Sequence, residues 1–417
     1  MSETIEKIIE YQKLYNERLY LVASENSPSI NARLSFLTDI FNRYYFPLEE
    51  HRSWAFPGNE VLEALHDHCR SYLRKLTGAR FVDIKPISGV NCMTVALASL
   101  TRPGDTIASI SPLNGGHHIT RFIAERFGCR VIYLPYEQGS FTFNFDSLEK
   151  VIEKEVSLIY LDQAHILFPF NLEEVRSRIP ETTKIYYDGS HVMGLIFGSN
   201  FQKPLQEGAS FLGGSTHKTI PGPHKGFIAT NDIGSYQNIE RTSKNFVSHD
   251  HGADVAALAV ILEEMDGKWY DYATRIVENA QYLAALLDGY GFAVAAKEFG
   301  FTKSHQIWVN TVQFMDAFEA VKVLARCGII VNSISAPAFP NQLALRIGVQ
   351  EVTYLGATKE VMAHIAEIFE RVLIKKSYSE AKVRSEVAEI KKKLLPAVDN
   401  RYLERVLNSL EIGSHRF

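Results

Sequence analysis

Two polar residues that follow short apolar runs could together carry out carbonyl chemistry. Asp188 ends the run 184–188, and Lys218 follows the run 209–212 within the motif Ser-Thr-His-Lys-Thr. Both runs predict buried strands, and α/β sheets place ligands at the carboxyl ends of their parallel strands. A lysine amine with a lowered pKa can form a Schiff base with a carbonyl. Because a nearby aspartate can hold a pyridinium nitrogen, the pair predicts a pyridoxal 5'-phosphate (PLP) site with Lys218 and Asp188 as catalytic residues.

Further side chains fit such a site, and most also have a purely structural alternative. His117 follows Gly115-Gly116, just inside a predicted helix, and would either stack on an aromatic cofactor or be a capping or surface histidine. Arg346 lies in the apolar run 343–347, where it would either clamp a substrate carboxylate or form an internal salt bridge. For Asp188, the structural alternative is that an acidic residue at a strand end only caps a turn. Lys218 has the weakest alternative, because a lysine directly after a strand and before Pro-Gly-Pro is not a typical solvated lysine.

Two glycine-containing turns are candidate phosphate sites. Ser88-Gly89 and Gly115-Gly116 both stand where a loop enters a predicted helix, and backbone N–H groups at a helix N-terminus bind phosphate. Glycine at such turns is also routinely structural. The chain contains neither GxxxxGK[ST] nor a GxGxxG after a strand, so nucleotide binding is not supported.

Composition excludes several classes of partner. The 417 residues carry a net charge of -4, which gives no reason to expect nucleic acid or an anionic membrane. No apolar run reaches membrane-spanning length, and the charged N-terminus is not a signal peptide. Four cysteines without CxxC spacing predict reduced thiols in a cytoplasmic protein. Neither the helix segment 66–69 nor the loop 248–252 has metal-ligand spacing, so no metal site is predicted.

From residue 81 onwards, strands alternate with helices, which predicts an α/β fold with a mostly parallel, doubly wound sheet covered on both faces. The expected strands are 81–84, 106–110, 131–134, 156–161, 184–187, 209–212 and, as a reversed neighbour, 226–229. The predicted domains are an N-terminal helical arm (1–45), a large cofactor-binding domain (46–280) and a smaller α+β C-terminal domain (281–417). Pro28 is expected in the first turn of a helix that runs through Phe36 and Ile40. The aromatic stretch 44–58 is expected to form a packed loop or a lid.

Several motifs in register give the chain a resemblance to serine hydroxymethyltransferase, a fold-type-I PLP enzyme. The matching motifs are Leu-Val-Ala-Ser-Glu-Asn at 21–26, Pro-Gly-Asp at 103–105, Gly-Gly-His at 115–117, Asp-Gly-Ser-His at 188–191, Thr-His-Lys-Thr at 216–219, Gly-Pro at 222–223 and Arg-Ile-Gly at 346–348. Their order and intervals agree over roughly residues 20 to 360. The resemblance implies a large domain with a seven-stranded sheet and PLP as the cofactor.

The resemblance also implies a role for each matching position. Catalytic residues would be Lys218 as the Schiff-base lysine, Asp188 as the pyridinium partner, His117 stacked on the ring and His191 near the phenolic oxygen. The remaining cofactor-binding positions would be Ser88, Gly89, Val90, Ser215, His217, His251 and Gly252. The substrate would be bound by Ser24, Tyr44 and Arg346. Tyr44 and the His251-Gly252 pair would come from a second subunit, which implies a homodimer with shared active sites.

The departures from the family pattern concentrate where tetrahydrofolate would be held and used. Val90 replaces a hydroxyl residue, and His224 replaces an arginine. Phe46 stands where the family has a glutamate that works on the folate-borne carbon, with Glu49 and Glu50 as substitutes only if the loop shifts. Phe56 replaces a tyrosine, and the insert at 335–340 is short.

These observations predict aldol, retro-aldol or transaldolase-type C–C bond chemistry at Cα of a small amino acid resembling serine, threonine or glycine. An aldehyde would be the co-substrate, and folate would not be required. A first alternative is authentic serine hydroxymethyltransferase with an altered tetrahydrofolate pocket. A second is a PLP aminotransferase or decarboxylating relative in secondary metabolism. A non-catalytic PLP-fold binding protein is the least favoured, because both Lys218 and Asp188 are retained.

Overall fold

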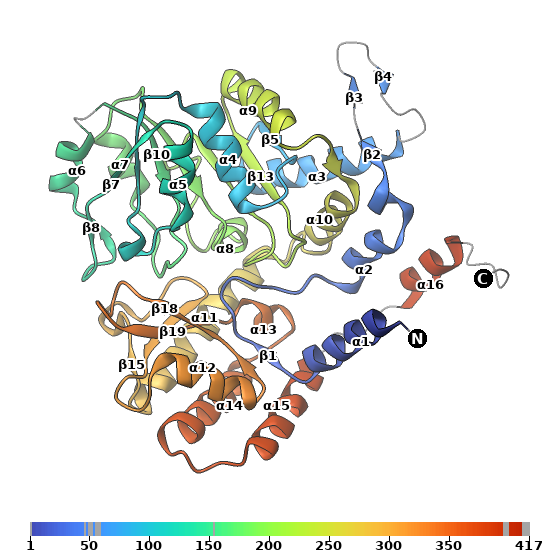
Figure 1. Cartoon of the computed structure of the whole chain (residues 1–417), viewed down its shortest axis with the longest axis vertical. Helices are drawn as coiled ribbons and strands as arrows, with labels where there is room; N and C mark the ends of the chain where they lie inside the picture. The colour runs from blue at the N-terminus through green and yellow to red at the C-terminus, as the bar shows by residue number, and fades with distance from the viewer. Residues whose placement is uncertain are drawn as a thin grey trace.

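The computed structural model describes residues 2–45, 47–48, 53–54, 60–152, 155–394 and 400–410. Figure 1 shows a larger body built around one sheet and, next to it, a smaller body built around a second sheet. The N-terminal helix α1 (Glu3–Asn16) and the C-terminal helix α16 (Asn400–Ser409) project on the same side. In the described part of the chain, no helix combines the length and apolar character needed to cross a membrane.

The larger body contains the predicted seven-stranded sheet, in the order β5-β13-β12-β11-β10-β6-β7. Its strands are β5 (Phe81–Asp83), β6 (Thr106–Ser109), β7 (Arg130–Tyr133), β10 (Val156–Leu161), β11 (Lys184–Asp188), β12 (Phe211–Ser215) and β13 (Gly226–Thr230). The five strands from β7 to β12 pair in parallel, while β13 pairs antiparallel with both β12 and β5. The predicted reversed neighbour is therefore confirmed.

Helices cover both faces of this sheet, as predicted. The helices are α3 (Val61–Thr77), α4 (Gly89–Leu100), α5 (Ile119–Arg126), α6 (Phe145–Ile152), α7 (Leu172–Ser177), α8 (Met193–Phe197), α9 (Ile233–Phe246), α10 (Gly252–Glu264) and α11 (Trp269–Gly289). Alternate strand residues face opposite cores: Leu158 packs with α4, α5 and α9, whereas Ile159 packs with the helices of the other face. Because both faces are buried, the central strands are apolar almost throughout.

The smaller body is an α+β unit around an antiparallel sheet of order β15-β16-β19-β18. Its strands are β15 (Ala293–Val294), β16 (Gln306–Asn310), β18 (Asn332–Ser335) and β19 (Leu343–Gly348), and its helices are α12 (Ala317–Arg326), α13 (Gln350–Tyr354), α14 (Lys359–Phe369), π-helical η6 (Glu370–Ile374) and α15 (Glu380–Leu394). The N-terminal segment joins it, because β1 (Leu19–Tyr20) pairs in parallel with β17 (Ile329–Ile330). Helix α11 continues through residue 280 to Gly289, so the two bodies share a long connecting helix.

The structure corrects the expected elements in two places. The helix predicted after Pro28 is divided into α2 (Ile30–Arg33) and the 3-10 turns η1 (Leu34–Leu37) and η2 (Asp39–Asn42). Helix α5 begins only at Ile119, so His117 lies before the helix and not inside it. Within the aromatic stretch, short pairs form as β2 (Tyr44–Tyr45), β3 (Pro47–Leu48) and β4 (Ser53–Trp54). Phe46, Glu49, Glu50 and Phe56 lie outside the described residues.

Shorter elements complete the described chain. These are η4 (Pro112–Asn114), the hairpin β8 (Tyr136–Glu137) with β9 (Thr142–Phe143), β14 (Asp250–His251), which pairs with β2, and η5 (Lys297–Phe299). The pairing of β14 with β2 connects the start of α10 to the N-terminal arm.

A buried carboxylate anchors this β14–β2 pair to the body. Asp250 is 1% exposed and lies 2.5 Å from Nζ of Lys85 and 3.3 Å from Nε2 of His66. Burial alone would raise the pKa of Asp250, but His66, Lys85 and the buried Lys225 together hold it well below its ordinary value. The amine of Lys225 has no hydrogen-bond partner among the described residues, so Asp250 is its main counter-charge.

We therefore expect Asp250→Asn to destabilise the protein by about 3–5 kcal/mol, because it removes the main counter-charge of the buried Lys225 and the close partner of the partly buried Lys85. Urea unfolding followed by tryptophan fluorescence measures this loss. Because the folded pKa of Asp250 is lowered, the difference from wild type is full at neutral pH and shrinks as the pH falls below about 4.

The matched control is Asp266→Asn, which removes an exposed ion pair with Lys75 at 2.7 Å. Exposed pairs contribute only about 0–1 kcal/mol, so this variant stays near wild type. Equal losses in the two variants would contradict the role assigned to Asp250.

Candidate active site

Most of the predicted site residues line a cavity of about 450 Å3 at the carboxyl ends of β10, β11 and β12. The sequence-predicted residues that line it are Ser24, Ser88, Gly89, Val90, His117, Asp188, His191, His217, Lys218 and Arg346. Ser215 lies behind Lys218 and accepts a hydrogen bond from its amine at 2.5 Å. Residues that are far apart in the sequence therefore share one chemical compartment, as expected for the edge of a parallel sheet.

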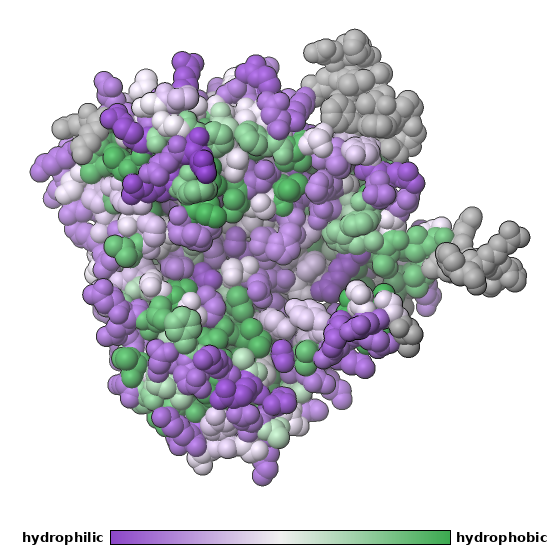
Figure 2. All heavy atoms as spheres, viewed as in Figure 1, coloured by the Kyte–Doolittle hydropathy of each residue, from purple (hydrophilic) through white to green (hydrophobic). Residues whose placement is uncertain are grey.

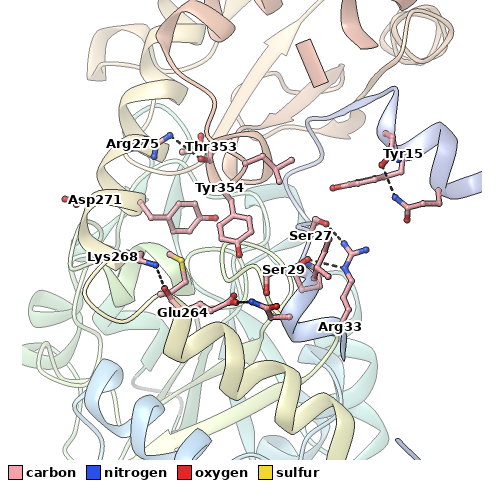
Figure 3. A pocket seen from close by; sticks show the side chains of 18 residues that line it. Tyr15, Ser27, Ser29, Arg33, Glu264, Lys268, Asp271, Arg275, Thr353 and Tyr354 are labelled. Atoms are coloured by element: carbon pink, nitrogen blue, oxygen red, sulfur yellow. Dashed lines mark hydrogen bonds between the residues drawn. The ribbon is translucent and has the colours of Figure 1, made fainter. Parts of the chain in front are cut away.

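A larger hollow of about 850 Å3 lies between α2, α10 and α11, and Figure 3 shows its walls. Labelled side chains there include Tyr15, Arg33 and Glu264, and the Glu264 carboxylate accepts a hydrogen bond from Asn31 at 2.8 Å. Neither Lys218 nor Asp188 lines this hollow. We assign the candidate active site to the smaller cavity because its chemistry, not its volume, distinguishes it.

Lys218 follows β12 and presents a partly neutral amine to the cavity. Its pKa is lowered to about 8, chiefly by burial; the Asp188 carboxylate opposes this shift, and the nearby Arg346 guanidinium adds to it. A lysine amine is nucleophilic only when neutral, so this environment suits attack on a carbonyl near physiological pH.

Asp188 is fixed at the end of β11 by two hydrogen bonds. Its Oδ2 accepts from the hydroxyl of Tyr160 at 3.2 Å, and its Oδ1 accepts from the backbone N–H of Ser190 at 3.0 Å. Gly214 on β12 has a φ of +138°, and a Cβ there would lie 2.8 Å from Oδ1 of Asp188. The neighbouring strand must therefore have glycine at this position for the carboxylate to stay where it is.

The start of α4 forms a cradle of backbone donors. The hydroxyl of Ser88 accepts from the N–H of Asn91 at 3.1 Å, which caps the helix. Among the described residues, no hydrogen-bond partner is found for the N–H groups of Gly89 and Val90, and both residues line the cavity. A Cβ on Gly89 would lie 3.1 Å from Oγ of Ser190, so the helix approaches the β11 loop closely. Such a helix start favours an anion.

Arg346 on β19 lies on the opposite wall, 7% exposed. Its Nε donates to Asn332 at 3.2 Å, and its Nη2 donates to the hydroxyl of Ser24 at 3.4 Å. No carboxylate of the described residues lies within 4.0 Å of its guanidinium, so the alternative of an internal salt bridge is wrong. Burial lowers the pKa of Arg346 to about 10, with the more distant Glu25 opposing. This guanidinium lacks a protein anion and remains available to one from a ligand.

Three predicted histidines, His117, His191 and His217, line the cavity, and burial lowers the pKa of each. His117 accepts a hydrogen bond at Nδ1 from the N–H of Ile119 at 3.3 Å, so it caps α5 and also lines the cavity. Burial lowers the pKa of His117, lowers that of His217 to about 3 and holds that of His191 well below its ordinary value. Nδ1 of His191 lies 3.4 Å from the amide nitrogen of Gln306.

Sequence reasoning missed the loop that follows β10, which contributes Asp162, Gln163 and His165 to the same cavity. The hydroxyl of Thr120 and the N–H of His117 both donate to Oδ2 of Asp162, and Oδ1 has no partner. Burial raises the pKa of Asp162 to about 7. The sequence does contain a signal for Asp162 as a site residue. Asp162 directly follows the predicted strand 156–161, just as Asp188 stands at the end of its own strand.

Tyr44, His251 and Gly252 do not reach this cavity. Tyr44 on β2 is the register partner of His251 on β14, and Gly252 begins α10. The centroid of the His249 ring lies 4.3 Å from the ring centroid of Tyr44 and 5.2 Å from that of His251. These residues form a separate surface cluster, which we call the β2–β14 cluster. Neither there nor elsewhere among the described residues do three or more His, Cys, Asp or Glu side chains form a possible metal site.

Comparison with known proteins gives a family match over most of the chain. The family model described as serine hydroxymethyltransferase matches residues 1–369. The serine hydroxymethyltransferase of Thermoplasma volcanium is 36% identical over 394 residues, which cover 92% of each chain. The fluorothreonine transaldolase of Streptantibioticus cattleyicolor is 34% identical over 388 residues, which cover 89% of this chain and 60% of that protein.

A solved structure has the same fold. The L-threonine transaldolase from Pseudomonas fluorescens, in its internal aldimine state, matches with a TM-score of 0.90 and 28% identity. The match covers 99% of this chain and 97% of the other.

The charges around Lys218 predict that two substitutions shift its pKa in opposite directions. In cofactor-free protein, the modification of Lys218 by an amine-reactive reagent should rise with a midpoint near pH 8. Asp188→Asn should move this midpoint down because it removes a carboxylate that stabilises the ammonium, and Arg346→Gln should move it up because it removes a repelling cation. Peptide mass spectrometry after short labelling pulses at a series of pH values measures all three midpoints.

Lys203, which is exposed, gives the reference curve in the same digests. Shifts in the same direction for both variants would contradict the electrostatic account of the cavity.

Proposed function

The chain belongs to the serine hydroxymethyltransferase family and is a PLP-dependent enzyme, and on this premise we propose that it breaks and forms the Cα–Cβ bond of a small β-hydroxy amino acid without tetrahydrofolate. The glycine unit would pass to a second aldehyde, as in a transaldolase. The observation that carries the proposal is the placement of the unpaired Arg346 guanidinium across one cavity from Lys218 and Asp188.

The donor set of the cavity fits PLP part by part. The Lys218 amine would bond to the aldehyde carbon, and the Asp188 carboxylate would bind the ring nitrogen. The free N–H groups of Gly89 and Val90 match the phosphate, with the hydroxyl of Ser88 as a further donor. The ring of His117 provides a flat surface beside this set. We propose His191 near the phenolic oxygen, and Ser215 and His217 as supports of Lys218.

The bound cofactor supplies an electron sink for the electron pair left at Cα, and the chain's own residues decide which bond is broken. We propose that Arg346 and the hydroxyl of Ser24 hold the substrate carboxylate. With the amino group directed to the Lys218 side, fixing the carboxylate sets the rotation about the remaining bond at Cα. The Lys218 amine, with its lowered pKa, is available to accept and return a proton at this carbon.

Several features support a reaction without folate. His224 stands where the family pattern has an arginine, and the insert at 335–340 is short. The ring of His224 stacks on that of His217 at 3.9 Å, so it packs against the residue next to Lys218. Two of the similar proteins are transaldolases by name. The 36% identity to a serine hydroxymethyltransferase favours the folate-dependent reaction as the second candidate.

We propose that the protein is a homodimer with shared active sites. The β2–β14 cluster of Tyr44, His249 and His251 lies outside the chain's own cavity, with Tyr44 48% exposed. Figure 2 shows apolar side chains gathered on the side of the molecule where α2, η1 and η2 lie. The exposed apolar residues of these elements are Ile30, Phe36, Leu37 and Phe41. A second copy that covers this side would bring its own β2–β14 cluster, including Gly252, towards the cavity.

We propose a cytoplasmic location for the enzyme. All four cysteines are buried and unpaired. A chain that keeps its thiols reduced suits a reducing compartment, where disulfides are rare.

Replacing Lys218 tests the cofactor assignment. Lys218→Ala should lose the visible absorbance band of the PLP-loaded protein, because the amine that engages the cofactor aldehyde is gone. The control Lys203→Ala removes an exposed lysine and should keep the band. An unchanged spectrum of Lys218→Ala would refute the lysine assignment.

One assay separates the two candidate reactions. The PLP-loaded protein is incubated with threonine or serine, with and without tetrahydrofolate, and the release of aldehyde and glycine is measured. We expect threonine cleavage without folate and transfer of the glycine unit to a second added aldehyde, because the folate-handling positions are replaced. Serine cleavage that strictly requires folate, with no transfer to an added aldehyde, would establish the second candidate.

A further inference from the structure

His165 is held rigidly at the edge of the active-site cavity by the loop that follows β10. Its backbone N–H donates to the carbonyl of Gly115 at 3.1 Å. Gly115 has a φ of +90°, and a Cβ there would lie 2.5 Å from the carbonyl oxygen of His165. The two loops therefore pack backbone against backbone, and only glycine permits this approach. The position of the His165 ring is set by the fold and not by an exposed, adjustable loop.

The ring of His165 lies next to the carboxylate-binding wall. It meets the ring of Trp308 edge to face, with the centroids 6.5 Å apart. Trp308 on β16 is the register partner of Arg346 on β19, and opposite residues of an antiparallel pair project from the same face. Gln306 strengthens the junction, because it donates to the carbonyl of Ala164 at 2.9 Å and accepts from the indole N–H of Trp308 at 3.2 Å.

The imidazole of His165 is neutral and has a free nitrogen. Its pKa is lowered to about 3, chiefly by burial, with smaller contributions from Arg346 and then His117. Nδ1 is buried without a partner, and Nε2 also has no hydrogen-bond partner among the described residues. The side chain lines the cavity, and Nε2, unlike Nδ1, is not among the fully buried unpartnered atoms. A neutral imidazole nitrogen can either accept or donate a hydrogen bond, so it suits an uncharged hydroxyl.

Neighbouring polar groups are less suited to the same task. The side-chain amide of Gln163 is engaged with the carbonyl of Asn114 at 2.9 Å. Oδ2 of Asp162 is engaged with Thr120 and His117, and Oδ1 is buried. On the β10 side of the cavity, His165 therefore offers a ring nitrogen that no described residue engages.

Resting on the proposed function, we propose that Nε2 of His165 hydrogen-bonds the hydroxyl on Cβ of the substrate and so selects β-hydroxy amino acids. Arg346 and Ser24 fix the carboxylate on one wall, and Lys218 marks the place of the amino group. The side chain at Cα then extends towards the third wall of the cavity, where His165 adjoins Arg346. A site built to bind a hydroxyl discriminates against analogues that lack it, because its own polar group is left unpaired.

The test compares one substrate that has the hydroxyl with one that lacks it. In PLP-loaded His165→Phe, we expect kcat/KM for threonine to fall about 10- to 100-fold, because the hydrogen bond is lost while the ring contact with Trp308 is kept. The dissociation constant of glycine, measured from the change in cofactor absorbance, should stay within about twofold of wild type. His165→Gln, whose amide reaches the position of Nε2, should recover part of the threonine activity.

A matched control is His364→Phe, the same substitution at an exposed histidine on α14, which should leave both quantities unchanged. The proposal is overturned if His165→Phe cleaves threonine as wild type does, or if it loses glycine and threonine binding equally. It is also overturned if His165→Gln is no better than His165→Phe. Failure of the proposed function looks different, because wild type itself would then release no aldehyde from threonine.

Discussion

The amine of Lys218 must stay partly neutral inside a protein, and the rest of the site depends on this constraint. Burial disfavours the ammonium form more than the Asp188 carboxylate favours it, so the pKa falls to about 8. The buried Arg346 guanidinium acts in the same direction from the opposite wall. Arg346 therefore has two consequences: it can hold a substrate carboxylate, and until that carboxylate arrives it keeps the lysine poised for attack.

Maintaining these charges at fixed distances requires both sheets. The parallel strands β10, β11 and β12 end at one edge, so Asp162, Asp188 and Lys218 meet there although their sequence positions are far apart. Arg346 comes from an antiparallel sheet, with Ser24 of the N-terminal segment beside it. The cavity thus lies between two bodies, and the hydrogen bond of Gln306 to Ala164 crosses that boundary.

The proposed reaction needs less from the chain than a folate-dependent one. A cofactor that accepts electrons from Cα needs an amine, a ring partner, a phosphate cradle and a carboxylate clamp. On the proposed assignments, the described residues around one cavity would fill all four roles. A folate pocket would have to use the altered aromatic stretch after Tyr44. A hydroxyl on Cβ needs only one neutral polar atom, and His165 offers one without any change in the fold.

The sequence alone predicted the α/β class, the reversed strand 226–229, the PLP cofactor and the lysine–aspartate pair. Strand periodicity and short motifs are properties of the local sequence, so they can be recognised without knowledge of the fold. The sequence left the alternatives for Arg346 open and placed His117 inside a helix that begins after it. Only the tertiary structure showed that Arg346 lacks a protein carboxylate within 4.0 Å among the described residues, because pairing depends on which strands become neighbours. It also brought Asp162 and His165 into the site, since their chemistry arises from burial, which no single position in the sequence can show.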